Sequence, residues 1–261
     1  MNKNIIYIGL LILFLLIAAT AGYRWYAQWK ENKEAAEGFR EIQAMVTEPP
    51  VQTDPEQNDA AEPAQKPAPK TAYETYEGLY KQNPHFLGWI RIEGTAVDYP
   101  VMYAPNQPDF YLRRDFYGSS SRHRVPYLEE LCAPGMSNNL IVYGHNMKDG
   151  SMFHDLLNYT DKAFWESHQT IRFDTMKEFG TYQIMTVFLY DAEWDPFKYH
   201  CYTDMDECDF EEFLEECRGR SLYETGVTAE YGDELLTLST CEYSHENGRF
   251  VVVAKRIREG D

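Results

Sequence analysis

The chain has 261 residues, of which 44% are hydrophobic, enough for one sizeable folded domain with accessory segments. Its formal net charge is −18, and residues 71–261 carry 17 Lys and Arg against 33 Asp and Glu. A surface this acidic repels phosphate backbones, so no nucleic acid partner is expected, and a cationic or amine-bearing partner is favoured.

Residues 4–23 form an apolar segment without a charged side chain. At a rise of about 1.5 Å per residue, this segment crosses a hydrocarbon core of about 30 Å, which predicts a membrane anchor within residues 1–23. A cleaved signal peptide is the alternative, because small residues lie near the end of the segment. The apolar run is longer than a usual signal-peptide core, and an aromatic and basic belt follows it, which favours the anchor. Basic residues on both sides leave its orientation open.

Two further segments separate this anchor from the folded domain. Residues 24–46 repeat apolar side chains near helical spacing with charges between them, which predicts a juxtamembrane helix. Residues 47–72 hold six of the thirteen prolines and contain no aromatic residue, leucine or isoleucine. Such a segment cannot bury apolar surface and is predicted to be a disordered tether. The folded domain is therefore expected to span residues 73–261.

The folded domain is predicted to be mainly β. Segments rich in Val, Ile, Tyr and Thr and bounded by turn residues predict strands at 88–92, 96–103, 138–144, 181–190, 234–240 and 249–257. Helical patterns occur at 71–82, 151–159, 160–168 and 209–220, the last with Phe210, Phe213, Leu214 and Cys217 on one face. Strands and helices do not alternate regularly, which disfavours a doubly wound parallel sheet. A closed or nearly closed β-barrel with helical insertions fits better.

Common catalytic and metal-binding motifs are absent from the sequence. It contains no G-x-S-x-G elbow, no H-E-x-x-H helix and no phosphate-binding loop. The acidic run 204–216 does not match a calcium-binding loop, because Cys208 breaks the pattern and the loop glycine is missing. We therefore expect neither a metal site nor a cofactor.

The five cysteines differ in their surroundings, and they form no C-x-x-C pair. An odd number outside the cell leaves at least one without an intramolecular partner. Cys132 and Cys217 are predicted to be buried apolar side chains, while a disulfide between Cys201 and Cys208 stays open. Cys241 ends an apolar strand and precedes a polar loop, where a side chain is both rigidly held and accessible to a substrate.

A thiol becomes an effective nucleophile when a neighbour takes its proton or stabilises the thiolate. His145 follows an apolar strand and precedes polar loop residues, so it is the first candidate for a general acid and base. His245 is closer in sequence but lies in a predicted flexible turn, and His154 lies on a predicted helix. Arg249 begins the strand after Cys241, and pairing of these two strands would bring its guanidinium to the thiol, where it can donate to a carbonyl oxygen. A solvent-facing arginine is the alternative.

Four stretches occur in a fixed order along the chain: "GWIRIEGTAVDYPV", "FYLRRDFYG", "YGHNMKDGSMF" and "TLSTC", the last followed eight residues later by Arg249. Together they resemble the sortases, and the class B sortases in particular. The similarity runs from about Tyr73 to Ile257. It implies a closed β-barrel of about eight strands, with N-terminal helices and a helical insertion before the last two strands. It also implies a cysteine transpeptidase on the outer face of a Gram-positive cell, anchored by a single membrane pass with its amino terminus in the cytoplasm.

The resemblance implies a role for each of three residues. Cys241 attacks the Thr carbonyl of a sorting motif, a short stretch of a surface protein that contains proline and threonine, and forms a thioester. His145 protonates the leaving amine and later deprotonates the incoming amine of a peptidoglycan precursor or a pilin lysine. Arg249 binds and polarises the substrate carbonyl.

Four other residues are expected to bind the peptide. Ser239 and Thr240 line the cleft, Leu112 contributes to the sorting-motif subsite, and the backbone N–H of Glu242 completes an oxyanion hole.

Two departures from the family pattern concern the cleft. Residues 123–135 differ from the stretch that family members often have in the cleft wall leading to His145. Pro108 stands where the family can carry a polar residue that contacts the peptide. Residues 192–231 resemble the class B insertion that shapes another wall.

Two other classes of function remain as alternatives. A cysteine hydrolase of surface peptides would let water finish the reaction, and a non-enzymatic tethered adaptor would keep the barrel without turning over substrate. Products formed with and without an added amine separate a hydrolase from a transpeptidase. The adaptor predicts no thiol-dependent turnover.

Overall fold

The computed structural model describes residues 3–46, 70–244 and 247–258. Most of the predicted tether and the competing His245 lie outside these residues. The chain divides into two compact units, Met1–Ala44 and Met45–Asp261.

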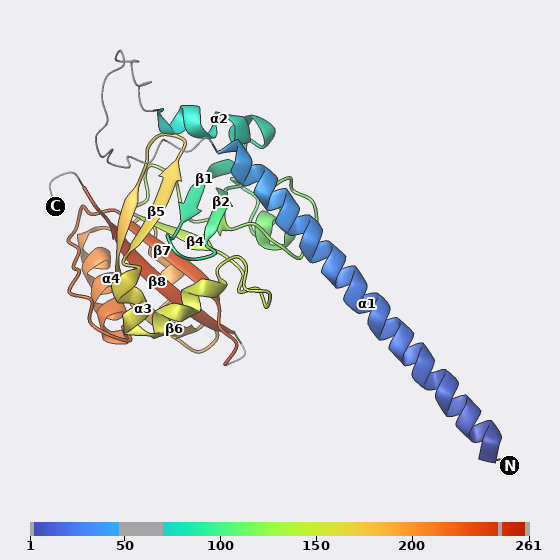
Figure 1. Cartoon of the computed structure of the whole chain (residues 1–261). Coiled ribbons are helices and arrows are strands. Elements are labelled where there is room, and N and C mark those ends of the chain that lie inside the picture. The colour runs from blue at the N-terminus through green and yellow to red at the C-terminus, as the bar shows by residue number, and fades with distance from the viewer. Residues whose placement is uncertain (1–2, 47–69, 245–246, 259–261) are drawn as a thin grey trace, which may run out of the picture. The chain divides into compact units, whose positions relative to one another are not determined.

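The first unit is a single long helix, α1 (Lys3–Met45), drawn in blue in Figure 1. It includes the apolar segment 4–23 and all but the last residue of the charged segment 24–46. Ion pairs between Lys30 and Glu34 and between Lys33 and Glu37 follow the i, i+4 spacing of a helix surface. From Gly9 onward α1 is long and apolar enough to cross a membrane by length and composition.

The second unit begins with α2 (Ala72–Gln82). A capping box starts this helix: the Glu74 N–H donates to Thr71 Oγ1, and the Thr71 N–H donates to the Glu74 carboxylate. Four residues on one face of α2 are buried, namely Ala72, Thr75, Tyr76 and Leu79. The predicted helix at 71–82 is therefore confirmed, with the amphipathic face that covers the barrel.

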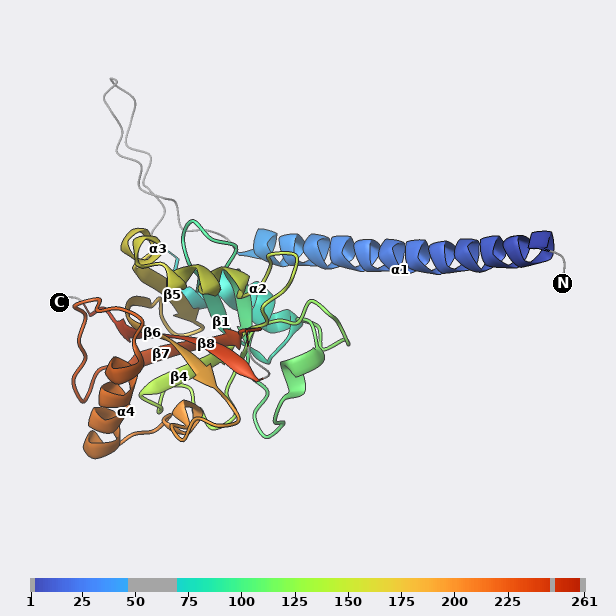
Figure 2. The same ribbon diagram turned by 90° about the horizontal axis from the view of Figure 1, so that it is seen from below.

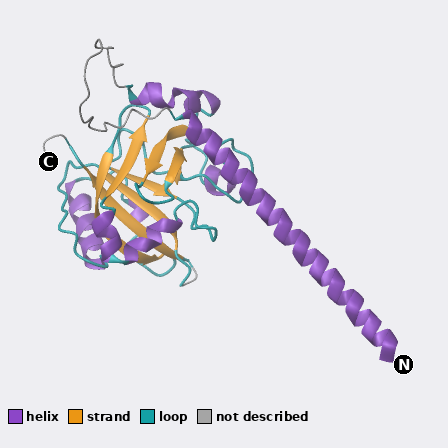
Figure 3. Cartoon of the chain, viewed as in Figure 1, coloured by secondary structure: helices purple, strands orange, loops and turns teal. Residues whose placement is uncertain are grey.

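The core is a closed barrel of eight strands, whose order is β1-β2-β3-β4-β7-β8-β6-β5. The strands are β1 (Phe86–Arg91), β2 (Asp98–Met102), β3 (Tyr127–Leu128), β4 (Asn139–Tyr143), β5 (Thr170–Thr175), β6 (Thr181–Asp191), β7 (Leu235–Cys241) and β8 (Gly248–Arg256). The β2–β3 and β4–β7 pairs are parallel and the others antiparallel. The predicted barrel is confirmed, and Figure 3 shows its strands in orange with helices outside them.

All six predicted strands are present, and two further strands were not predicted. β3 has only two residues and follows Pro126, so it leaves almost no pattern. β5 buries Ile171 and Phe173 as an alternating strand does, but it also buries Asp174, which interrupts the apolar pattern.

The helical insertions include one correction. The predicted helix 151–159 is instead an isolated bridge at Met152 followed by the 3-10 helix η2 (His154–Thr160). The other short helices are η1 (Phe110–Arg113), α3 (Lys162–Ser167) and η3 (Tyr199–Cys201). α4 (Glu207–Arg220) packs against β6 (Figure 1 and Figure 2) and buries the predicted face of Phe210, Phe213, Leu214 and Cys217.

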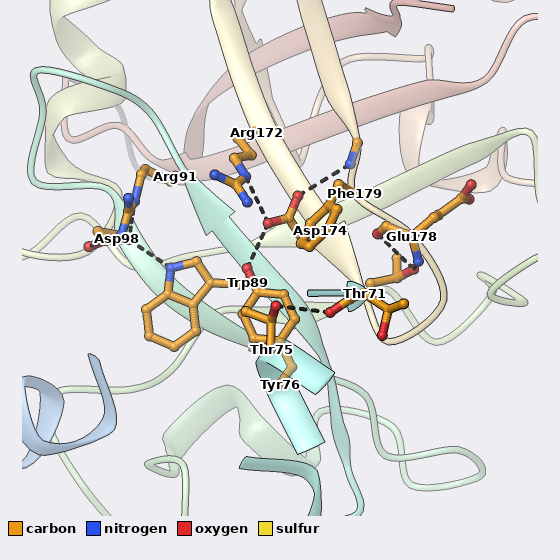
Figure 4. A network of polar contacts seen from close by, with 12 residues as sticks. Thr71, Thr75, Tyr76, Trp89, Arg91, Asp98, Arg172, Asp174, Glu178 and Phe179 are labelled. Atoms are coloured by element: carbon orange, nitrogen blue, oxygen red, sulfur yellow. Dashed lines mark hydrogen bonds and ion pairs between the residues drawn. The ribbon is translucent and has the colours of Figure 1, made fainter. Parts of the chain in front are cut away.

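A buried polar network joins α2 to β5 (Figure 4). Asp174 is only 1% exposed, and its carboxylate accepts hydrogen bonds from the Tyr76 hydroxyl at 2.6 Å, Arg172 Nε at 2.8 Å and the Gly180 N–H at 3.2 Å. A buried carboxylate is tolerated when donors surround it in this way. This network fixes α2 on the barrel and explains why a strand can hold an aspartate in its core.

Candidate active site

Cys241 and Arg249 are directly opposed residues of the antiparallel β7–β8 pair. Opposed residues of neighbouring strands point to the same face of a sheet. The predicted pairing of the two strands therefore places the thiol and the guanidinium side by side. The same row continues to Tyr190 of β6, which is opposed to Arg249.

His145 reaches this row from the other side of β7. β4 and β7 are parallel, and Tyr143 is the partner of Ser239. The Gly144 N–H donates to the Ser239 carbonyl at 3.0 Å, so the ladder continues one step beyond β4. His145 lies two residues after Tyr143, and Cys241 lies two residues after Ser239. The parallel pairing thus brings His145 and Cys241 to the same end of the pair.

Gly144 allows the chain to make this approach. A Cβ atom at Gly144 would lie 2.3 Å from the aromatic ring of Phe153, which is fully buried. The backbone N–H of Phe153 in turn donates to the His145 carbonyl at 2.9 Å. Phe153 therefore supports the histidine through both its ring and its backbone, and only glycine fits in front of it.

These side chains line an open cleft of about 460 Å³. Six of the seven predicted site residues are among its lining residues, namely Leu112, His145, Ser239, Thr240, Cys241 and Arg249. Tyrosines from several elements form much of the remaining wall: Tyr103, Tyr111, Tyr127, Tyr143, Tyr190 and Tyr199. A cleft that brings a thiol, an imidazole and a guanidinium together beside an aromatic wall suits an extended peptide.

The His145 imidazole is surrounded by groups that favour its neutral form. Burial lowers the pKa of His145 below its usual value, and the charges of Arg124 and Arg249 lower it further, against an opposing hydrogen bond to the Leu112 carbonyl. Nε2 lies 3.1 Å from the Leu112 carbonyl oxygen and 3.5 Å from Arg124 Nη1. A neutral imidazole can accept the proton of a neighbouring thiol.

Arg124 is a site residue that the sequence reasoning missed. It belongs to the stretch 123–135 that departs from the family pattern, and other residues of this stretch, from Tyr127 to Glu130, line the cleft. One arginine in a short basic run gives no signal of its own. Its approach to His145 depends on the chain path before β3.

Ser239 and Thr240 contribute to the cleft in different ways. The Ser239 hydroxyl lies 2.7 Å from the hydroxyl of Tyr199, which belongs to η3. Thr240 is opposed to Phe250, so its side chain points to the other face of the sheet from Ser239 and Cys241. Both belong to the cleft wall, but only Ser239 presents its side chain on the face of the thiol.

Glu242 requires a correction. Its backbone N–H, expected in an oxyanion hole, donates to the Gly248 carbonyl at 2.9 Å, and Glu242 is not among the cleft-lining residues. Its carboxylate accepts a hydrogen bond from the Ser244 N–H instead. The N–H closes the β7–β8 turn and is therefore not free to bind a substrate oxygen.

The other cysteines are free thiols. Cys132 and Cys217 are buried, as predicted, whereas Cys201 and Cys208 are exposed and form no disulfide. Within the described residues, no three His, Cys, Asp or Glu side chains gather as a metal site would require.

The insertion 192–231 forms part of the cleft wall. Ala192, Tyr199 and His200 belong to it and line the cleft, while α4 packs behind them on β6. Pro108, at the second departure from the family pattern, is a lining residue as well.

A closed barrel with a cysteine, a histidine and an arginine at one cleft is suited to thiol-dependent acyl transfer. A family model described as a sortase domain matches residues 90–257. Sortase B of Staphylococcus aureus is 34% identical over 189 residues, covering 70% of this chain and 75% of that protein. Sortase B of Listeria monocytogenes is 33% identical over 183 residues, covering 69% and 72%.

Solved structures agree with these matches. A Staphylococcus aureus sortase B–substrate complex superposes with a TM-score of 0.64 at 31% identity, covering 71% of this chain and 86% of that one. The chain belongs to the sortase family of cysteine transpeptidases, and its relatives are class B members.

Proposed function

We propose that this protein cleaves a C-terminal sorting motif of surface proteins after its threonine and transfers the protein to an amine. Cys241 is the nucleophile, His145 the general acid and base, and Arg249 the group that binds the substrate carbonyl. The single observation that supports this most strongly is the convergence of these three side chains on one cleft from three different strand ends.

The geometry supports a two-step acyl transfer. The thiol proton of Cys241 passes to the neutral imidazole of His145, and the sulfur attacks the threonine carbonyl carbon. As the C–N bond breaks, the imidazolium returns the proton to the leaving amine and a thioester remains. An incoming amine then attacks the thioester, loses a proton to His145, and releases the thiolate as the C–S bond breaks. Arg249 donates hydrogen bonds to the carbonyl oxygen when it carries negative charge.

The acceptor is an amine of a lipid-linked peptidoglycan precursor or a pilin lysine. The acidic surface of the folded domain supports an amine-bearing partner, because it attracts cationic groups over distances of about a Debye length. The donor is a peptide containing proline and threonine. The similar structure of a Staphylococcus aureus sortase B–substrate complex supports substrate binding by this chain as well.

The amino-terminal segments of the chain support a proposed location. We propose that residues 1–23 contain the cytoplasmic amino terminus and the membrane anchor, and that residues 24–46 continue as a juxtamembrane helix. Residues 47–72 then act as a tether for the extracellular catalytic domain, residues 73–261. The apolar, charge-free run at the start of α1 supports a single membrane pass.

A peptide panel tests this proposal. The full-length chain in detergent micelles is offered pentapeptides that vary around proline and threonine, with and without triglycine or a diaminopimelate peptide, and the products are measured by mass spectrometry. Cys241→Ala is the control, because it removes the sulfur and leaves the cleft open. We expect amide-linked products that require both the amine and Cys241.

The other outcomes identify the alternatives. Cleavage that needs Cys241 but gives only free carboxylates, even with excess amine, would mean a hydrolase. Absence of any Cys241-dependent product from the whole panel, with a correctly folded protein, would favour a tethered adaptor and contradict the proposal.

A further inference from the structure

At the end of the ladder between β4 and β7, a side-chain hydrogen bond takes the place of a backbone hydrogen bond. After the bond from the Gly144 N–H to the Ser239 carbonyl, the next bond in the same direction along a parallel ladder would run from the residue 146 N–H to the Cys241 carbonyl. Instead, the side-chain Nδ2 of Asn146 donates to the Cys241 carbonyl at 2.9 Å. The backbone of residue 146 is thereby free to turn away from the sheet, while the contact with β7 is kept.

Both ends of the Asn146 amide are in use. The residue is 5% exposed, and its Oδ1 lies 2.7 Å from Nδ1 of His154. Nδ2 must be the donor to the Cys241 carbonyl, so Oδ1 is the acceptor and His154 Nδ1 carries a proton. His154 therefore fixes which way the amide of Asn146 points.

The backbone of Asn146 is held from the cysteine side as well. Its carbonyl accepts a hydrogen bond at 2.9 Å from the hydroxyl of Tyr243, two residues after Cys241. The residue also forms an isolated antiparallel bridge with Met152. Asn146 thus joins the segment that carries His145 to the segment that carries Cys241 through two separate hydrogen bonds.

We propose that Asn146 is a positioning residue for the transfer reaction, oriented by His154. It sets the distance and angle between the His145 imidazole and the Cys241 sulfur by tying the carbonyl of Cys241 to the residue that follows His145. Asn146 is not among the cleft-lining residues, so it acts through the placement of its neighbours and not on the substrate. This inference rests on the proposed function of Cys241 and His145.

Steady-state kinetics of the full-length protein in detergent micelles test the proposal. Asn146→Ala removes both amide contacts, and Asn158→Ala is the matched control, because Asn158 is exposed and its side-chain amide donates to Asp155 of the same short helix. We expect Asn146→Ala to lower kcat about 100-fold, since a displacement of about 1 Å in a reacting pair costs that much, with KM within about twofold of wild type. The control should match wild type in both parameters.

A second readout does not depend on the sorting peptide. Alkylation of Cys241 by iodoacetamide, followed by mass spectrometry, reports how well the imidazole takes up the thiol proton. We expect Asn146→Ala to slow alkylation at Cys241 and to leave the exposed Cys201 and Cys208 unchanged. If the wild-type protein shows no turnover of any peptide, the proposed function fails, and this arm still decides the role of Asn146.

The His154 variants test the orienting contact. His154→Leu removes the donor to Asn146 Oδ1 and should lower kcat about tenfold, the value of one good hydrogen bond, whereas His154→Gln keeps a donor and should retain most of the rate. If Asn146→Ala does not fold, these two His154 variants still test the positioning role of Asn146. Equal kinetics for Leu and Gln, or a folded Asn146→Ala protein with wild-type kcat and alkylation rate, would overturn the proposal. The proposal would also be overturned if the activity loss of Asn146→Ala merely accompanied a lower melting temperature and disappeared on cooling.

Discussion

Cys241 and Arg249 are opposed across the β7–β8 pair at the end where this pair enters the cleft. The turn between them is closed by the bond from the Glu242 N–H to the Gly248 carbonyl. A Cβ atom at Gly248 would lie 2.7 Å from the Glu242 carbonyl oxygen, so this close approach of the two strands requires glycine there. The backbone positions of Cys241 and Arg249 are therefore fixed relative to each other by the strand pairing and by the Glu242–Gly248 contact.

The first prediction concerns Arg249. Arg249→Lys keeps the charge but loses the planar fork of donors, and Arg249→Gln loses the charge as well. We expect kcat to fall about 100-fold for the lysine variant and further for the glutamine variant, as for loss of an oxyanion-stabilising donor. Turnover of the sorting peptide measures this.

Arg218→Gln is the matched control, because Arg218 is an exposed arginine of α4 and is not a lining residue of the cleft. It should behave as wild type. A lysine variant with wild-type kcat would mean that Arg249 supplies only charge, and a glutamine variant with wild-type kcat would remove Arg249 from the mechanism.

The second prediction concerns the pKa of His145. Arg124→Gln removes a positive charge 3.5 Å from Nε2 and should raise the pKa of His145, measured by the pH dependence of its ring signals in NMR spectra of the labelled protein. An unchanged pKa in this variant would show that burial and the charge of Arg249 depress it without Arg124. Arg122→Gln is the control for a nearby surface charge.

The same depressed pKa has a consequence for stability. The unfolded chain protonates this histidine near its ordinary value of about 6.5, whereas the folded protein resists protonation. The unfolded state therefore binds more protons as pH falls below 6.5, and the contribution of His145 to folding stability is present above that pH and lost below it. Denaturant unfolding at several pH values should show that the free energy of unfolding falls less with decreasing pH in Arg124→Gln than in wild type.

The sequence predicted some spatial relationships better than others, for physical reasons. Neighbouring strands joined by a short polar stretch pair as a hairpin, so the proximity of Cys241 and Arg249 follows from local pattern alone. The proximity of His145 depends on the parallel pairing of β4 with β7, about ninety residues later in the chain. No local signal specifies such a pairing, and only the family resemblance implied that His145 acts together with Cys241.

Other features depended on tertiary contacts that no residue pattern carries. Arg124 reaches His145 through the path of an irregular segment, and Asn146 makes its bonds only because the chain leaves the ladder there. The buried carboxylate of Asp174 interrupts the apolar pattern of β5, and two of its donors come from elsewhere in the chain, from α2 and from Gly180 just before β6. A buried polar side chain of this kind is recognised only when its burial and its hydrogen-bond partners are both known, and the sequence shows neither.

The third prediction concerns thiol accessibility. Cys201, Cys208 and Cys241 should react with a disulfide reagent in the native protein, whereas Cys132 and Cys217 should react only after unfolding. Burial raises the pKa of Cys132 to about 12, and burial raises the pKa of Cys217 as well, so neither provides a thiolate in the folded state. Peptide mapping of the labelled sites measures this. Rapid native labelling of Cys217 would mean that α4 leaves the barrel easily.

The last prediction concerns Gly144, whose missing side chain lets Phe153 support His145. Gly144→Ala places a methyl group within 2.3 Å of the Phe153 ring, and neither the ladder nor the buried ring can move without cost. Overpacking of this kind lowers the free energy of unfolding by about 1–3 kcal/mol. It should also lower kcat more than the stability loss explains, because His145 moves with its neighbour.

Two variants control the experiment on Gly144. Gly219→Ala has open space around the new methyl group on an exposed helix, so it should raise stability by about 1 kcal/mol and leave kcat unchanged. Adding Phe153→Leu to Gly144→Ala removes part of the clash, and this double variant should regain stability relative to Gly144→Ala alone. If Gly144→Ala instead keeps wild-type stability and activity, the backbone between β4 and His145 has room to relax, and the placement of the histidine does not depend on this contact.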